Sequence, residues 1–173
     1  MSIYDFYFSF PGLTNDTITL LQQRHPHVMD VFLSSYSIRA EGMCGGKFNG
    51  PNCKRFLYYL PQLELYLGEG VGQEIISYLK TLKELHHLMV AKTLNPDFKI
   101  VIDRWRKAFD ILHHLYNFSM TEKAHILYHH AETFFLETGN TLHMASAEGI
   151  EASHSKFKTV GQISLFIIRE YNV

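Results

Sequence analysis

Three histidines and two glutamates lie close together in the C-terminal part of the sequence and could bind metal ions. His125, His129 and His130 fall in one predicted helix, and Glu148 and Glu151 follow in a segment rich in small residues. On a regular helix, residues four apart share a face, whereas residues five apart point about 140° away from each other. His125 and His129 could therefore chelate one ion, and the alternative is that the histidines are half-buried and bonded to neighbours.

The two acids also allow two interpretations. Glu148 and Glu151 are three residues apart and share a helix face. A carboxylate among small residues can bind Mg²⁺, which takes one or two protein carboxylates and keeps several of its waters. The second interpretation is an acidic first turn, which the helix dipole stabilises without any ligand.

A glycine-rich segment at residues 42–53 is followed by cations that could contact phosphate. Lys47, Lys54 and Arg55 lie in it or directly after it, at the start of a predicted helix. The segment lacks the GK[ST] ending of a Walker loop, and a purely structural turn is the alternative. Lys156 and Lys158 add two cations at the end of the predicted acidic helix, about 145–158.

Two Glu-x-x-His elements suggest a third kind of metal chemistry. They span Glu84–His87 and Glu122–His125. Di-iron bundles take half of their ligands from such elements and the rest from two inward glutamates on other helices. Glu64 and Glu151 are candidates for those two positions. This alternative predicts about two irons per chain.

The bulk composition indicates one globular domain, residues 1–173, of an intracellular protein. Hydrophobic residues make up 46% and charged residues 19%, which excludes a disordered chain. The net charge of −1 excludes a global basic field. Two cysteines without a CxxC pair fit a reducing compartment. The first residues carry no basic segment typical of a signal peptide, and no apolar run of about 18 residues predicts a membrane span.

The periodicity of the apolar residues predicts an all-α fold, an irregular bundle of about six helices. Residues 3–10 are expected to form a short strand or an apolar plug that Pro11 and Gly12 end. Ser119 to Glu122 matches a capping box, and Gly139 matches the residue that follows a helix. Pro26 either interrupts the helix that starts near residue 16 or begins a second helix through about residue 36. The other predicted helices span about 52–67 with a bend near Pro61, 73–94, 97–117, a helix that ends near 137, and 145–158; the core helices lie within about 73–137.

Read together, three of these segments resemble the C-terminal catalytic region of the V(D)J recombinase large subunit and of Transib-type transposases. Related transposon-derived proteins of invertebrates share the pattern. Its parts are a Gly/Asn/Phe loop with a basic helix, an H-x4-H pair and a late S-E-G-x-E-like segment. They match residues 45–57, His125 with His130, and residues 146–151. The resemblance covers roughly residues 15–160.

The resemblance implies a role for each matched residue. His125 and His130 would supply half of a zinc site, on a helix expected to be irregular there or where chain elements meet. Glu151 would be the third acid of a DDE triad, with Glu148 beside it, and would bind magnesium only if assembled with the missing acids. The two aspartates and the cysteine pair of the family have no match in this sequence.

The leading hypothesis is therefore a transposase-derived helical domain that is catalytically inactive alone. Its implied partners are DNA and the missing catalytic portion or a second chain, with a nuclear location if the source is eukaryotic. No membrane partner is expected. The third hypothesis is a plain protein-interaction domain whose histidines are structural.

Overall fold

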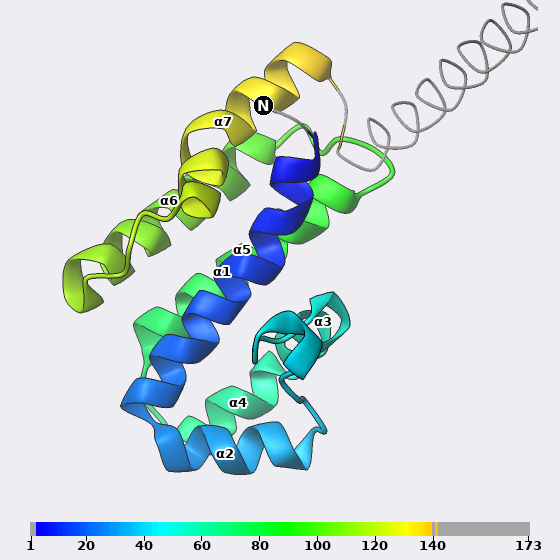
Figure 1. Ribbon diagram of the computed structural model, residues 1–173. Coiled ribbons are helices and arrows are strands. Elements are labelled where there is room, and N and C mark those ends of the chain that lie inside the picture. Colours follow the sequence, from blue (N-terminus) through cyan, green and yellow to red (C-terminus); the bar gives the residue numbers. More distant parts are fainter. Residues whose placement is uncertain (1–2, 140, 142–173) are drawn as a thin grey trace, which may run out of the picture.

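The computed structural model describes residues 3–139 and residue 141, and this part of the chain is all-α (Figure 1). It contains no strand, only one isolated bridge between Glu41 and Lys47. The all-α prediction is confirmed. The helices are α1 (Ile3–Arg24), α2 (Pro26–Ser35), α3 (Gly50–Tyr58), α4 (Leu60–Leu67), α5 (Gln73–Val90), α6 (Phe98–Tyr116) and α7 (Glu122–Thr138), with a 3-10 turn, η1 (Gly42–Cys44), between α2 and α3.

Helix α1 corrects the prediction of a strand or plug at residues 3–10, because one helix runs from Ile3 to Arg24 and includes Pro11. Proline in a helix interior removes one backbone hydrogen bond and costs about 3 kcal/mol. Burial offsets this cost, since Leu13, Ile18 and Leu21 are completely buried. Tertiary packing thus overrides the local signal of the proline.

The core lies between α1 and the antiparallel helices α5, α6 and α7. Helix α1 packs against α7, α2, α5 and α3, and α6 packs against both α5 and α7 (Figure 1). Tyr78 of α5 meets Trp105 and Phe109 of α6, with ring centroids 6.3 Å apart in both pairs. All three side chains are fully buried. Aromatic burial of this extent is a large part of the driving force for folding.

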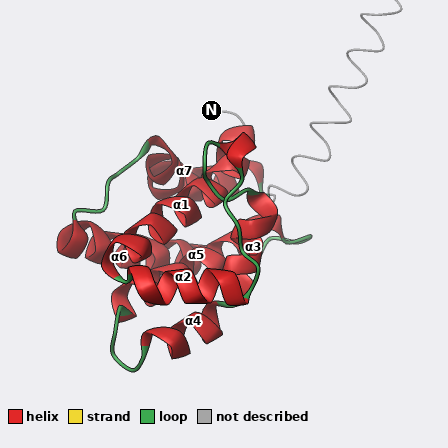
Figure 2. Cartoon of the chain, turned by 60° about the horizontal axis from the view of Figure 1, so that its bottom comes forward, coloured by secondary structure: helices red, strands yellow, loops and turns green. Residues whose placement is uncertain are grey.

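Three shorter helices, α2, α3 and α4, lie at one end of the molecule, the lower end in Figure 1, which is turned forward in Figure 2. Pro26 begins α2, which is one of the two roles expected for it, because proline is preorganised for the first helical turn. The predicted helix over 52–67 is divided at Tyr59 into α3 and α4, and Pro61 stands in the first turn of α4. The bend near Pro61 is therefore a helix boundary.

At the two ends of α7, one predicted residue is confirmed and one is corrected. Gly139 ends α7 with φ of 62°, as predicted. The cap of α7 is Thr121 and not Ser119: the Thr121 hydroxyl accepts a hydrogen bond from the amide of Ala124 at 3.4 Å. The predicted acidic helix, 145–158, lies outside the described residues.

Candidate functional site

The glycine-rich loop has a defined backbone. The amide of Glu41 donates to the carbonyl of Lys47 at 3.0 Å, and the amide of Gly46 donates to the carbonyl of Glu41 at 3.1 Å. Gly45 and Gly46 have φ of 63° and 76°, a region in which side chains other than glycine's are disfavoured. The two glycines therefore allow the chain to close on itself between Glu41 and Lys47.

Asn15 of α1 fixes this loop to the helical body. Its Oδ1 accepts a hydrogen bond from the amide of Phe48 at 2.8 Å. Its Nδ2 donates to the carbonyl of Phe48 at 2.8 Å and to that of Pro11 at 2.8 Å. The side chain is only 9% exposed, so these bonds are shielded from water. Sequence reasoning missed Asn15; the signal was an amide flanked by the apolar positions Leu13 and Ile18 of one helix.

Helix α3 follows the loop directly, and the side chain of Asn49 caps its N-terminus. Asn49 Oδ1 accepts a hydrogen bond from the amide of Asn52 at 2.9 Å, and the Asn49 amide group donates to the Glu41 carboxylate. Pro51 follows in the first turn. An asparagine at this position stabilises a helix start by about 1 kcal/mol. The start of α3 is thus held at the same place as the loop.

Three of the cations predicted to contact phosphate lie on this loop and on α3. Lys47, Lys54 and Arg55 are all exposed. Arg55 Nη1 donates to the carbonyl of Ser37 at 3.1 Å, which orients its guanidinium along the segment that follows α2. The other two predicted cations, Lys156 and Lys158, lie outside the described residues, as do Glu148 and Glu151.

Beside the loop is a pocket of about 390 Å³ between α1, α3 and α5. Cys53 and His86 both line it. Burial raises the pKa of the Cys53 thiol to about 12, so it stays protonated and is no nucleophile at neutral pH. Burial, Lys54 and His87 lower the pKa of His86 to about 4, so its ring is neutral.

The three predicted histidines lie together on α7. Ring centroids are 4.6 Å apart for His125 and His129, and 5.4 Å apart for His125 and His130. All residues from 122 to 138 are α-helical, so the irregularity expected there is not observed. Side-chain rotation, and not a bulge in the backbone, brings the rings of His125 and His130 near each other.

The described residues do not complete a zinc site around these histidines. A structural zinc ion needs four ligands in a tetrahedron. Within 3–139 and 141, no group of three or more His, Cys, Asp or Glu side chains could hold a metal ion. Cys53 lies at the pocket, protonated, and is not a ligand to a site on α7. His125 and His130 offer at most half of the donor set.

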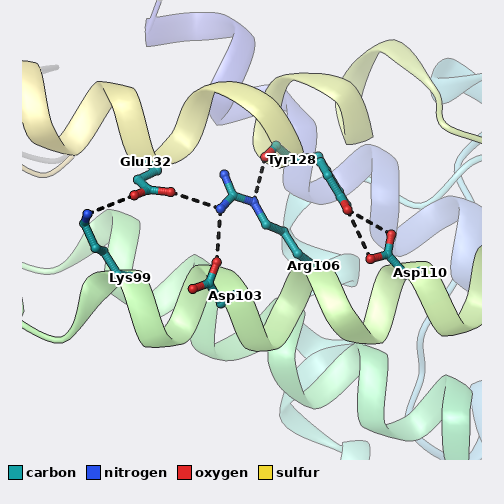
Figure 3. A network of polar contacts seen from close by, with 6 residues as sticks. All are labelled: Lys99, Asp103, Arg106, Asp110, Tyr128 and Glu132. Atoms are coloured by element: carbon teal, nitrogen blue, oxygen red, sulfur yellow. Dashed lines mark hydrogen bonds and ion pairs between the residues drawn. The ribbon is translucent and has the colours of Figure 1, made fainter.

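Helix α7 is held in place by a polar network that centres on Arg106 of α6 (Figure 3). Its Nε donates to the carbonyl of Tyr128 at 2.8 Å, and its Nη1 contacts Glu132 at 3.0 Å and Asp103 at 3.1 Å. Hydrogen bonds from Arg106 and Lys99 lower the pKa of Glu132. The network fixes the face of α6 against which α7 lies.

The Glu-x-x-His residues lie on the surface, which gives the di-iron alternative no support. Glu84, His87, Glu122 and His125 are all exposed, whereas the ligands of a di-iron bundle project into its core. Glu84 instead pairs with Arg104 at 3.3 Å. The nominated Glu64 pairs with Lys80 at 2.8 Å.

No helix within the described residues has the length and apolar character needed to span a bilayer. Comparison of the chain with known protein families, with curated proteins and with solved structures gives no match.

Proposed function

We propose that this chain is a transposase-derived helical domain and that its loop and α3 contact the phosphate backbone of DNA. The proposal combines the motif order with one structural observation. Lys47, Lys54 and Arg55 are exposed on a segment whose backbone Asn15 and Asn49 hold in place. Cations on a preorganised segment lose less conformational entropy on binding than cations on a loose one.

The same segment explains why binding would be independent of sequence. Lysine and arginine side chains bind phosphate oxygens, which are alike at every base pair. The net charge of −1 leaves the whole molecule without a basic field, so affinity depends on the local cations. Binding should then weaken steeply as salt is added, because each neutralised phosphate releases counterions.

In this proposal His125, His130, Glu148 and Glu151 keep the roles that the resemblance implies only in an assembled complex. The two histidines would need two further ligands from elsewhere, and Glu151 would need the two missing acids. Two-metal phosphodiester chemistry requires carboxylates that bridge both ions. The chain by itself would therefore bind DNA without cutting it.

The test is DNA binding measured by fluorescence anisotropy with a labelled duplex over a range of salt concentrations. The variant is the triple substitution Lys47→Gln, Lys54→Gln and Arg55→Gln. If all three cations contact phosphate, the slope of log affinity against log salt should fall in magnitude by about 2.7. Affinity at low salt should fall at least about tenfold.

A matched control removes the same charges elsewhere. Lys92, in the segment after α5, and Arg104 and Lys107, on α6, are all exposed. Their conversion to glutamine should leave the slope unchanged. Equal effects of the two triple variants would contradict a local DNA site. A wild-type protein that binds no duplex at low salt would contradict the proposal as a whole.

A second comparison tests Glu151, which the resemblance implies to be a metal ligand. Glu151→Gln should leave DNA affinity without divalent metal unchanged. If other chains complete the active site, the variant should weaken magnesium-dependent binding only in the assembled complex. A loss of metal-free binding would contradict the role assigned to Glu151.

A further inference from the structure

The pocket beside the loop has walls made mostly of carbon. It lies where the middle of α1, residues 48–50, α3 and the end of α5 meet. At about 390 Å³ it falls within the range of roughly 300–1,000 Å³ typical of small-molecule sites. The apolar residues that line it include Phe10, Pro11, Phe48, Pro51, Leu57 and Val90.

Most polar groups at the pocket are already used within the protein. The Thr14 hydroxyl donates to the carbonyl of Phe10 at 2.8 Å. Cys53 Sγ contacts the carbonyl of Phe48 at 3.5 Å. The Asn49 side chain caps α3. These groups therefore contribute little to the recognition of a ligand.

Two polar groups remain available to a ligand. Within the described residues, neither the Lys54 ammonium nor the His86 ring makes a hydrogen bond or an ion pair. The ammonium carries one positive charge at the pocket. The ring of His86 packs edge-on against Phe10, with centroids 4.8 Å apart. In its neutral form this ring has one N–H group that can donate a hydrogen bond.

The start of α3 adds no strong anion site. Pro51 has no amide proton, the amide of Asn52 is bonded to Asn49 Oδ1, and the amide of Cys53 is bonded to the carbonyl of Asn49 at 2.9 Å. A doubly charged phosphate would therefore meet one cation and few free donors. A singly charged group matches the single ammonium better.

We propose that this pocket binds a small hydrophobic monocarboxylate, with its carbon body against the apolar wall and its carboxylate on Lys54. The assignment goes beyond the proposed DNA contact and does not depend on it. The carbon body supplies most of the affinity, because the binding free energy grows with the apolar surface removed from water. The ion pair with Lys54 selects the charged end.

The test compares decanoate with decanol, which has the same chain and no charge, by isothermal titration calorimetry. Wild-type protein should bind both. Lys54→Met should weaken decanoate about tenfold and leave decanol within about twofold, since a charged pair at a pocket is worth roughly 1.4 kcal/mol. Val90→Phe, which fills the pocket, should weaken both ligands.

Val31→Phe is the control for the larger side chain, because Val31 lies on α2, is 43% exposed and does not line the pocket. It should bind both ligands as the wild type does. The NMR signal of the His86 ring in wild-type protein gives a readout that needs no variant, and decanoate should shift it. Circular dichroism confirms that each variant is folded.

Any one of four results would overturn the assignment. If wild-type protein binds neither ligand, the pocket is not a binding site for such molecules. If decanoate binds wild type and Lys54→Met with equal affinity, the carboxylate does not contact Lys54. Unchanged binding by a folded Val90→Phe protein, or an unmoved His86 signal, places the ligand elsewhere. None of these results tests the DNA proposal, which depends on the salt titration of the triple variant.

Discussion

Asn15 and Phe48 are 33 residues apart in the chain and are joined by two hydrogen bonds of 2.8 Å each. The side-chain amide of Asn15 donates to the carbonyl of Phe48 and accepts from its amide, as a neighbouring strand would. One buried side chain therefore satisfies both backbone groups of a loop residue. The position of the glycine-rich loop, and of the cations on it, depends on this contact.

Replacement of Asn15 by alanine should destabilise the fold by about 2–4 kcal/mol. The substitution leaves the amide of Phe48 without a partner and its carbonyl with only the weak contact from Cys53 Sγ at 3.5 Å. A buried unpaired group costs roughly 1–3 kcal/mol. Urea unfolding followed by circular dichroism measures the change. Asn15→Asp keeps the acceptor but loses the donor and should also destabilise.

The matched control for this change is Thr19→Ala on the same helix. Thr19 is exposed and its hydroxyl donates to the carbonyl of Asn15 at 2.9 Å, inside a helix. Its loss should cost no more than about 0.5 kcal/mol. If both variants lose a similar free energy of unfolding, the hydrogen bonds between Asn15 and Phe48 contribute no more to stability than an ordinary bond inside a helix.

Cys53 should react slowly with thiol reagents in the folded protein. It is 3% exposed, and burial raises the pKa of its thiol to about 12. The thiolate fraction at pH 8 should thus be roughly a thousandfold below that of an ordinary cysteine. A Cys44→Ser background leaves one thiol, whose labelling by DTNB is timed with and without urea. Equal rates in both conditions would contradict the burial of Cys53.

His86 should make stability fall with decreasing pH between about 6.5 and 4. Burial, Lys54 and His87 hold the folded pKa at about 4, below the usual value near 6.5. In that window the unfolded chain binds a proton that the folded chain does not, so stability is complete above pH 6.5 and is lost on acidification. The loss should be on the order of 1–2 kcal/mol, because the ring is partly exposed.

The measurement is urea unfolding of wild type and His86→Leu from pH 7.5 to 4.5. The variant should show a shallower decline. Lys54→Met should raise the pKa of His86, since it removes a neighbouring positive charge, and should also reduce the decline. Parallel curves for wild type and His86→Leu would contradict a lowered pKa.

Arg106 and Glu132 should be coupled more strongly than a pair on the open surface. Their side chains are 20% and 28% exposed, against 50% and 33% for Lys80 and Glu64. A double-mutant cycle with alanine should give about 1–2 kcal/mol for the first pair. The second pair should give about 0.5 kcal/mol or less. Equal coupling energies would show that burial of the Arg106 network adds nothing.

Local sequence signals identified most of the helices. The periodic apolar residues of α5 and α6 predicted both helices to within a few residues at each end. Proline at position 26 and glycine at 139 marked a helix start and a helix end, because their backbone preferences act over one or two residues. The all-α class follows from these short-range rules.

Other features depend on residues that are distant in the chain. Pro11 predicts a break, yet α1 continues because Leu13, Ile18 and Leu21 are buried against other helices. The exposure of Glu84, its pairing with Arg104, and the low pKa of His86 likewise arise from packing between elements. No pattern within a short window carries that information.

The sequence by itself determined the helical class, the loop, and the grouping of His125, His129 and His130 on one helix, since each follows from spacing along the chain. Only the tertiary structure decided that Asn15 holds the loop, that Cys53 and His86 line a pocket, and that Arg106 fixes α7. The physical reason is that burial and hydrogen bonding between distant residues depend on how the helices pack.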